Sequence, residues 1–384
     1  MQGADFVDGL SGKVLKTARG YLAYVPNSLE PQIDLSLSLV KELSEADRAL
    51  SELAGIARTL PNPHLLIGPF LRREAVLSSR IEGTQASFSD LLFFEAARLG
   101  EKTVPDVREV SNYVQAMEYG LERLSSLPVS LRLIREIHQR LMAGVRGETQ
   151  TPGEFRRSQN WIGPAGCSLQ DATFVPPPVE EMHSALDAFE KYIHTPSELP
   201  ALMRLALIHY QFEAIHPFLD GNGRVGRLLV TLLLCAEKLL PQPLLYLSAY
   251  FERHRDKYYH YLLEVSQKGA WKQWIQYFLK AVAVQSRDAI QKIDNLLTLR
   301  QEYRRRLQQA RASALLLQLV DDLFDFPAII NPTLSKRMKI TPRSAQLNID
   351  KLVEKGILRE ATGQQRNRVY IATEIVAVIE RDES

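Results

Sequence analysis

The sequence predicts a mainly α-helical protein with one small β-hairpin and a separate small unit at its C-terminus. Three observations support this fold class. Apolar residues recur mostly at helical spacing, a Gly- and Pro-rich stretch interrupts them at 146–178, and new helix signals start near residue 311. Hydrophobic residues make up 45% and charged residues 24% of the 384 residues, as in soluble globular proteins. A chain of this length holds two or three domains, and we expect units at 1–105, 106–300 and 301–384.

Charge and composition exclude several classes of protein. The 47 Lys and Arg residues against 45 Asp and Glu leave a net charge of +2, so no global basic field indicates nucleic-acid binding. Two cysteines, Cys167 and Cys235, cannot form a disulfide framework and suit a reducing compartment. The first residues lack a basic stretch followed by an apolar one, and no uncharged apolar run reaches about 18 residues. We therefore expect a cytoplasmic protein with no signal peptide and no membrane partner.

The helical stretches follow one another along the chain, after an irregular arm expected at residues 1–35. Ser44 suits the N-cap of the first helix, and Pro61 and Pro63 suit its end. Gly83 suits the end of the second helix. The expected helices lie at 44–60, 66–82, 106–124, 130–143, 179–194, 201–215, 224–239, 255–266 and 270–299.

The stretch 146–178 differs from its surroundings because glycines, prolines and short apolar pairs replace the helical pattern. We expect a long loop with a small hairpin. A loop of this length inside a compact domain is usually functional or disordered.

The C-terminal unit has its own order of elements. Thr341 suits the N-cap of its last helix, Pro342 the first turn, and Gly356 the C-terminal cap. Helices are expected at 313–324, 331–338 and 341–355, and alternating strands at 357–361 and 368–372. This helix–helix–turn–helix–hairpin order is that of a winged helix-turn-helix.

The segment from His216 to Arg227 reads HPFLDGNGRVGR and lies between two apolar helices. Its glycines let the backbone approach a ligand, and free N–H groups at the start of the following helix favour an anion. Arg224 and Arg227 add charge for phosphate oxygens, and Asp220 can hold a divalent cation. His216 can act as a base near neutral pH. Together these residues suit a Mg²⁺–nucleotide site beside a general base, which is typical of phosphoryl or nucleotidyl transfer.

Four other interpretations compete with this phosphate site. Residues 221–226 also match the dinucleotide pattern GxGxxG, but that pattern requires a preceding strand and a helix precedes it here. No Gly-Lys-Ser/Thr follows, so a P-loop is absent. Glu213 and His216 resemble a di-iron pair, but Pro217 breaks the required helix. A Gly-rich connection with capping arginines would explain each residue alone, but it does not explain the ordered set.

The segment resembles the signature of the Fic family, H-P-F-x-D/E-G-N-G-R-x-x-R, and matches it at every defined position. The resemblance covers residues 40–285 and includes GEFR at 153–156, ATFVPPP at 172–178 and YYHYLLE at 258–264. It implies a Fic-type helical bundle with a β-hairpin flap at 158–178. It also implies an enzyme that transfers AMP from ATP to a Ser, Thr or Tyr hydroxyl of a target protein and releases pyrophosphate.

The resemblance further implies a role for each matched residue. His216 would be the general base, and Asp220 would bind the Mg²⁺ that bridges the α- and β-phosphates. Arg227 would hold the terminal phosphate. The implied ATP-binding residues are Gly221, Asn222, Gly223, Arg224, Val225, Gly226, Arg227 and Tyr258. On the flap, Phe174 and Val175 would either lie over the site or only pack the loop.

Related enzymes transfer other groups, which leaves alternatives. Kinase-like relatives lack the second glycine of the motif, whereas Gly223 is present here and favours AMP transfer. Phosphocholine or UMP transfer remains an alternative. A further alternative is a transcription regulator or partner-binding protein that uses the Fic core as a nucleotide sensor.

The sequence from Ser78 to Gly83, SSRIEG, resembles the Fic inhibitory motif S/T-x-x-x-E-G/N. The resemblance implies that Glu82 pairs with Arg227 and so takes the arginine that the γ-phosphate needs. The same glutamate supports AMP removal in some relatives, so a bifunctional enzyme is a further alternative. Without the Fic motif, Glu82 would be interpreted as a solvated helix end that Gly83 caps.

The C-terminal unit is locally basic, since residues 311–368 hold ten Lys and Arg against six Asp and Glu. The side chains that suit phosphate and base contacts are Arg343, Gln346, Lys351, Arg366 and Arg368. Asp350 on the same helix would oppose DNA. Winged helices also bind proteins, so the possible partners are DNA, a target protein, the chain itself through self-modification, and a second copy in a homodimer.

Overall fold

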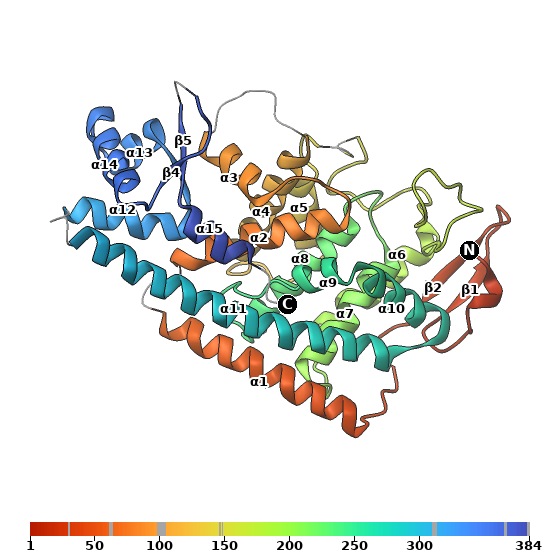
Figure 1. The fold of residues 1–384 in the computed structure, drawn as a ribbon. Coiled ribbons are helices and arrows are strands. Elements are labelled where there is room, and N and C mark those ends of the chain that lie inside the picture. The colour runs from red at the N-terminus through yellow and green to blue at the C-terminus, as the bar shows by residue number, and fades with distance from the viewer. Residues whose placement is uncertain are drawn as a thin grey trace.

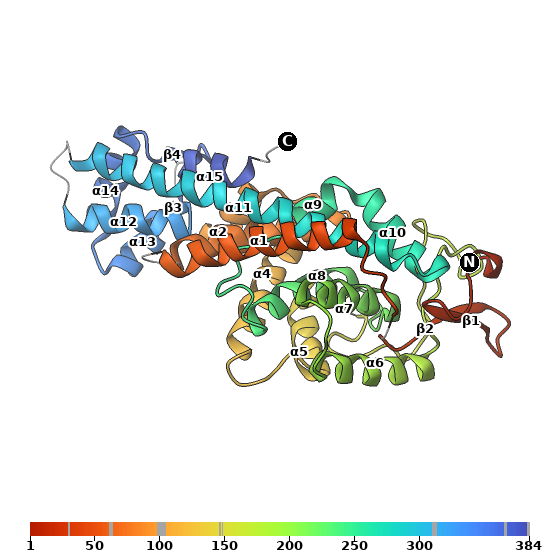
Figure 2. The same cartoon turned by 90° about the horizontal axis from the view of Figure 1, so that it is seen from below.

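The protein is mainly helical, as the sequence predicts. A computed structural model describes residues 1–29, 31–60, 64–97, 105–145, 147, 149–308, 313–364 and 367–381. The long helix α11 (Trp271–Gln308) runs along most of the molecule, and α1 (Leu37–Thr59) packs beside it (Figures 1 and 2). None of the described helices is both long and apolar enough to span a membrane.

A β-hairpin lies near the N-terminus, where the sequence predicts an irregular arm. The elements there are η1 (Gly3–Asp5), β1 (Gly12–Lys16) and β2 (Leu22–Pro26), and the strands pair antiparallel from Gly12 with Pro26 to Lys16 with Leu22. Gly20 has a φ of 86°, which lets the chain reverse between the strands. The expectation of an arm without strands is therefore wrong. Tyr24 is buried and its N–H donates to the carbonyl oxygen of Val175, so the hairpin is held against the flap.

Helix α1 begins at Leu37, so Ser44 is not an N-cap and that prediction is wrong. Leu39 is fully buried on the added turns, which shows that the apolar stripe against α11 extends further toward the N-terminus than Ser44. The expected helix stops, Pro61 and Pro63, lie outside the described residues. The following helices are α2 (His64–Ile81), α3 (Phe88–Ala97), α4 (Pro105–Arg123), α5 (Leu131–Leu141), α6 (Val179–His194), α7 (Ala201–Ile215), α8 (Asn222–Ala236), α9 (Ser248–Arg253) and α10 (Arg255–Lys268).

Helices α7 and α8 lie at the centre of this part and are buried along almost their whole length. Helices α4 and α5 pack on α8, while α6, α10 and α11 pack on α7. Helix α2 also contacts α8, and its C-terminal end reaches the first turns of α8. The packing therefore brings two segments that are far apart in the sequence to one point: the start of α8 and the end of α2.

The expected flap hairpin is reduced to a single antiparallel bridge, between Ile162 and Phe174. Ile162 N–H donates to Phe174 O (2.8 Å), and Phe174 N–H donates to Ile162 O (3.0 Å). The rest of 158–178 consists of turns and irregular backbone. The many glycines and prolines leave too few consecutive residues for a longer ladder.

The C-terminal unit has the element order that the sequence predicts, with one strand and one helix in addition. Its elements are α12 (Ala314–Asp325), β3 (Ala328–Ile330), α13 (Asn331–Met338), α14 (Pro342–Glu354), β4 (Arg359–Glu360), β5 (Val369–Ile371) and α15 (Thr373–Glu380), with strands in the order β3-β5-β4. Thr341 caps α14 by accepting from Ser344 N–H (3.2 Å), and Gly356 takes the positive φ expected of a C-terminal cap. Helix α11 passes the expected boundary at residue 300 without a break. The unit lies at one end of the molecule, where α12 and α15 pack on α2 and α11 (Figure 1).

Candidate active site

The loop between α7 and α8 is closed by the side chain of Asn222. Phe218 N–H donates to Asn222 Oδ1 (2.8 Å), and Asn222 Nδ2 donates back to Phe218 O (2.8 Å). Gly221 is the N-cap of α8 at a φ of 79°. Because a side chain pointing into the turn would meet Met142, glycine is the residue that this close approach requires.

His216 sits at the C-cap of α7 in the left-handed region, with φ 49° and ψ 61°. Its Nδ1 lies 3.2 Å from the carbonyl oxygen of Glu213. A carbonyl oxygen only accepts, so Nδ1 carries the hydrogen and Nε2 keeps a free lone pair. Burial lowers the pKa of His216 to about 4, so the ring is neutral at neutral pH. The histidine therefore has the tautomer and charge of a base that is ready to accept a proton.

The first turn of α8 is the predicted anion site, and here a carboxylate lies against it. A Cβ on Gly223 would lie 2.3 Å from Glu82 Oε1 and 2.9 Å from Arg227 Nη1. Glycine is therefore needed for Glu82 to reach the helix. The first N–H groups of a helix have no intrahelical partner and attract negative charge, so the Glu82 carboxylate occupies a place that suits a phosphate.

Arg227 is buried and bound to the end of α2 by three hydrogen bonds. Its Nη2 donates to Glu82 Oε1 (2.6 Å) and to Ser78 O (2.9 Å), and its Nε donates to Ser78 Oγ (2.9 Å). Burial alone would raise the pKa of Glu82, but the charge of Arg227 and its hydrogen bond outweigh burial and lower that pKa. Gly83 follows at a φ of 96° and ends the helix. The structure thus brings together the two residues that the sequence predicts as an inhibitory pair.

Arg224 points inward rather than toward solvent. Its Nη1 lies 3.3 Å from Glu109 Oε2 on α4, and its Nη2 lies 3.6 Å from Asp220 Oδ1. Thr84 Oγ1 also donates to Glu109 (3.2 Å), so this carboxylate connects α4 to the segment after Gly83. The sequence pattern does not indicate Glu109, because it belongs to a separate helix and no motif includes it.

Two segments of the chain match known protein families. Residues 40–122 match the family described as Fic/DOC family N-terminal, and residues 128–234 match the Fic/DOC family. The second match includes the loop from His216 to Arg227. The chain belongs to the Fic/DOC family. The resemblance seen in the sequence is therefore confirmed.

Named relatives of this Fic-family chain share only part of their length with it. It is 30% identical over 164 residues to "Protein adenylyltransferase Fic" of Drosophila erecta and 31% identical over 164 residues to the protein of that name from Drosophila virilis. The match covers 42% of this chain, and the chain spans 30% of the length of these curated relatives. A crystal structure of a Fic family protein from Desulfovibrio desulfuricans G20 has a TM-score of 0.56 at 16% identity, and the match covers 92% of this chain and 100% of that chain. This likeness shows the fold.

The Fic loop offers one carboxylate for a magnesium ion. The side chain of Asp220 is 37% exposed, and its Oδ1 accepts from Gly221 N–H (2.6 Å). Among the described residues, no cluster of three or more His, Cys, Asp or Glu side chains is placed to hold a metal. Mg²⁺ needs no such cluster, because it is commonly held by one or two carboxylates, substrate phosphates and water. Asp220 therefore fits an ion that arrives with a nucleotide.

The flap residues Phe174 and Val175 are buried under the N-terminal hairpin instead of being presented over the Fic loop. The Phe174 ring lies 5.5 Å from the Tyr24 ring, and Val175 packs with Ala23. Of the two interpretations that the sequence left open, the structure shows packing. Trp161 is the exposed aromatic residue of the flap.

Tyr258 is buried and its hydroxyl is engaged inside the protein. His209 Nδ1 lies 3.2 Å from the carbonyl oxygen of Gly226, so Nδ1 donates and Nε2 accepts from the Tyr258 hydroxyl (2.8 Å). Burial lowers the pKa of His209 to about 3, which keeps the ring neutral.

The neighbouring Tyr259 is 40% exposed. Burial raises the pKa of Tyr259 to about 12, and the charge of Glu82 acts in the same direction. Both tyrosines therefore interact with the ion pair, and Tyr259 is the more exposed of the two.

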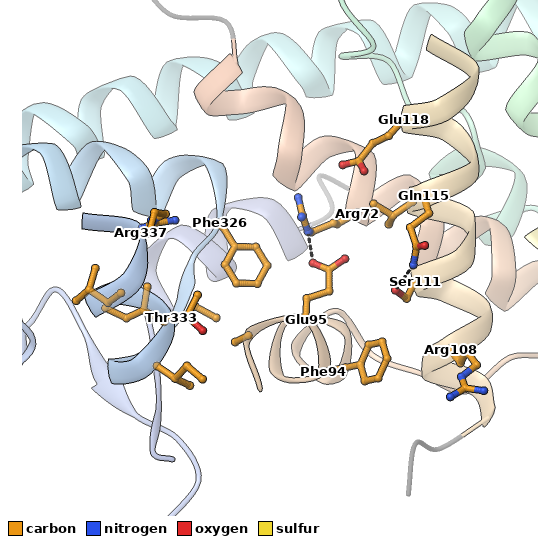
Figure 3. A pocket seen from close by; sticks show the side chains of 16 residues that line it. Arg72, Phe94, Glu95, Arg108, Ser111, Gln115, Glu118, Phe326, Thr333 and Arg337 are labelled. Carbon is orange, nitrogen blue, oxygen red and sulfur yellow. Dashed lines mark hydrogen bonds and ion pairs between the residues drawn. The ribbon is translucent and has the colours of Figure 1, made fainter. Parts of the chain in front are cut away.

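A pocket of about 800 Å³ lies away from the Fic loop, between α3, α4 and the C-terminal unit (Figure 3). Arg72 of α2 forms part of its wall and pairs with Glu95 (2.6 Å), while its guanidinium lies 4.9 Å from the centre of the Phe326 ring. None of the residues from His216 to Arg227 lines this pocket, so it is separate from the predicted nucleotide site.

Proposed function

We propose that this chain is a protein adenylyltransferase, which transfers AMP from ATP to the hydroxyl of a Ser, Thr or Tyr in a protein. The curated relatives carry that name, although the chain spans 30% of their length. The observation that carries the proposal is the pairing of a neutral histidine, free at Nε2, with a helix N-terminus and two buried arginines. That set can accept a proton and hold phosphates at one place.

The reaction needs one proton transfer and one exchange of bonds at phosphorus. His216 Nε2 takes the proton of the target hydroxyl, whose oxygen then attacks the α-phosphorus of ATP. The new O–P bond forms while the bond from the α-phosphorus to the bridging oxygen breaks, and pyrophosphate leaves. Backbone N–H groups of Asn222 and Gly223 and the charge of Arg227 stabilise the phosphate oxygens. Asp220 would hold Mg²⁺, which supplies further positive charge to the phosphates when it is bound.

We also propose that the described state is inhibited. Glu82 bonds to Arg227, and Ser78 takes two more of its hydrogen bonds. A γ-phosphate that needs the same guanidinium must displace Glu82 from a short, partly buried contact. While Glu82 stays in place, ATP binds with its phosphates in the wrong place, so the α-phosphorus does not face His216.

Incubation with ATP labelled at the α-phosphate, followed by gel separation of the proteins, tests both proposals. We expect strong labelling of a target protein or of the chain itself with the Glu82→Gly variant, and weak labelling with the unchanged chain. Glu122→Gly, at an exposed glutamate of α4, is the matched control and should label as weakly as the unchanged chain. His216→Ala in the Glu82→Gly background should abolish labelling. Nucleotide binding without any labelling would contradict transfer. A parallel incubation uses ATP labelled at the γ-phosphate, and label retained on protein only in that incubation would show a kinase instead.

The C-terminal unit adds no second function to this proposal. Gln346, a predicted DNA contact, is engaged inside the protein: it accepts from Asn331 Nδ2 (3.0 Å) and donates to Asp350 Oδ1 (2.8 Å). Arg366 lies outside the described residues. DNA binding therefore stays a prediction from the sequence, to be tested by a salt-dependent shift of duplex DNA that Arg343→Ala weakens.

A further inference from the structure

The carbonyl oxygen of His216 receives two hydrogen bonds from the segment that leads into the flap. Arg156 Nε donates to it over 3.0 Å, and Asn160 Nδ2 donates to it over 3.1 Å. Asn160 Nδ2 also donates to Phe218 O (2.7 Å). Since both acceptors are carbonyl oxygens, the amide nitrogen must face them, and this fixes the orientation of the Asn160 side chain.

Arg156 is a buried guanidinium that is held by carbonyl groups. Its side chain is fully buried, and within the described part of the chain it forms no ion pair with a carboxylate. Its remaining side-chain bonds go to the carbonyl oxygens of Ser158 and Pro177, and its backbone N–H donates to Pro217 O (2.9 Å). Burial lowers the pKa of Arg156 to about 10, so it stays charged at neutral pH. A buried charge without a counter-ion is costly, so stability alone does not account for an arginine at this position.

The backbone of His216 needs support from outside its own helix. Its φ of 49° lies in the left-handed region, which is unfavourable for a residue with a side chain. Its N–H donates to Phe212 O (3.0 Å), so the amide on one side is fixed by α7. Within the part of the chain that the structure describes, the carbonyl on the other side is held from the flap side alone, by Arg156 and Asn160. Such a conformation persists where several surrounding contacts hold it in place. The direction of the imidazole ring depends on the amides on both sides of His216.

We propose that Arg156 and Asn160 are positioning residues for the transfer reaction: they hold the His216 carbonyl group and thereby aim Nε2 at the target hydroxyl. This inference rests on the proposed adenylyl transfer. Arg156 also binds Pro177 O at the end of the flap, so the same guanidinium fixes the base and the flap relative to each other. A displacement of a reacting group by about 1 Å can lower a rate about 100-fold. Loss of either hydrogen bond to the His216 carbonyl is therefore expected to lower the transfer rate.

Arg156→Lys and Asn160→Ala, each in the Glu82→Gly background, test this proposal. Lysine keeps the charge but cannot donate in several fixed directions, and alanine removes only the amide. We expect each variant to lower kcat tenfold or more, with the dissociation constant for a non-hydrolysable ATP analogue unchanged within twofold. Arg157→Lys is the matched control, because its side chain is 84% exposed and pairs with Glu154 outside the site. An unchanged kcat would overturn the proposal, and so would a loss of nucleotide binding or a drop in melting temperature that accounts for the loss of kcat.

A second measurement reads the position of His216 without relying on transfer. Nitrogen-15 NMR of a histidine-labelled chain reports the tautomer and the pKa of the His216 ring. We expect one tautomer, protonated at Nδ1, in the unchanged chain. In both variants we expect tautomer exchange and a higher pKa, because the ring gains access to water. If the Glu82→Gly protein transfers no label, the proposed function fails, but the NMR result still decides whether the two residues position His216; an identical ring signal in both variants would overturn that role.

Discussion

At the scale of single residues, the surroundings of His216 set the pH range in which it can act as a base. Burial lowers its pKa to about 4, and the positive charge of Arg156 contributes in the same direction. A base works only while it is deprotonated, so activity is lost as pH falls through that pKa. We predict that kcat/KM of the Glu82→Gly protein stays level from pH 7 to about 5 and falls only below that. The removal of Glu82 strengthens this expectation, because its negative charge raises the pKa of His216. A pH profile of the initial rate checks this, and an acid limb near pH 6.5 would contradict it.

Gly226 lies where α7 and α8 approach each other closely. A Cβ there would lie 2.3 Å from Glu213 Oε1 and 3.2 Å from a carbon of the Phe212 ring. We predict that Gly226→Ala lowers the free energy of unfolding by about 1–3 kcal/mol, because a methyl group must force these side chains apart. Gly55→Ala is the control: apart from the surrounding backbone of α1, no atom of the described residues lies within 4 Å of its Cβ position, so it should raise stability by about 0.5–1 kcal/mol. Urea denaturation of both variants measures the difference, and equal effects would contradict the close approach.

At the scale of elements, helices bounded by proline were the most predictable. Helices α6 and α7 begin and end at the predicted residues, with Pro178 and Pro200 as the residues before them. Helices α3 and α9 were missed because one to three turns contain too few residues for a clear period. Strand β3 was missed because its partner, β5, lies far along the chain and no local pattern shows such pairing. Helix α11 continues past the predicted end at 299, where Tyr303 and Leu307 are buried.

The residues of the active site also differ in how well the sequence predicts them: those in a local motif were predictable, and those brought in by distant contacts were not. The loop from His216 to Arg227 was predictable because its residues are consecutive. The contact of Glu82 with Arg227 was predictable only through the family resemblance, since the two lie far apart in the sequence. Glu109 reaches this loop from a helix that no motif includes. Arg156 and Asn160 reach it from GEFR and the flap, where the resemblance marks the segment but not the contact with His216. Their roles follow from packing, which the order of residues does not reveal.

Two residues at the end of α2 hold Arg227: Ser78 in the last turn of the helix, and Glu82, which follows the last helical residue. We predict that Ser78→Ala raises basal transfer, but less than Glu82→Gly does, because it removes one hydrogen bond and leaves the ion pair. Loss of a hydrogen bond to a charged group is worth about 1.5–3 kcal/mol. Ser79→Ala is the matched control, since the Ser79 hydroxyl is buried on the same turn and has no hydrogen-bond partner among the described residues. Rates of α-phosphate labelling compare the three variants, and equal rates for Ser78→Ala and Ser79→Ala would show that the hydroxyl does not restrain Arg227.

At the scale of the whole molecule, the Fic region and the C-terminal unit share one hydrophobic core. A single cluster of buried side chains runs from Phe6 to Ile379 among the described residues. Helix α2 lies between the two parts (Figures 1 and 2). It packs on α12, and Ser78 in its last turn accepts a hydrogen bond from Arg227. Arg73 Nη2 donates to Glu380 O of α15 (3.4 Å). A continuous core of this kind favours unfolding in one cooperative step.

Gly68 is the position on α2 where this continuity can be tested. A Cβ there would lie 2.5 Å from the backbone oxygen of Asp325 and 2.5 Å from its Oδ1, at the end of α12. Because one of these atoms belongs to the backbone, it cannot rotate away, and Gly68→Ala must separate α2 from α12. We predict a loss of about 1–3 kcal/mol in the free energy of unfolding. Calorimetry should show one transition that moves to lower temperature as a whole. If the variant instead splits the transition, with only a small part melting early, the C-terminal unit is a separate cooperative unit despite the shared core, and α2 does not tie it to the end that holds Arg227.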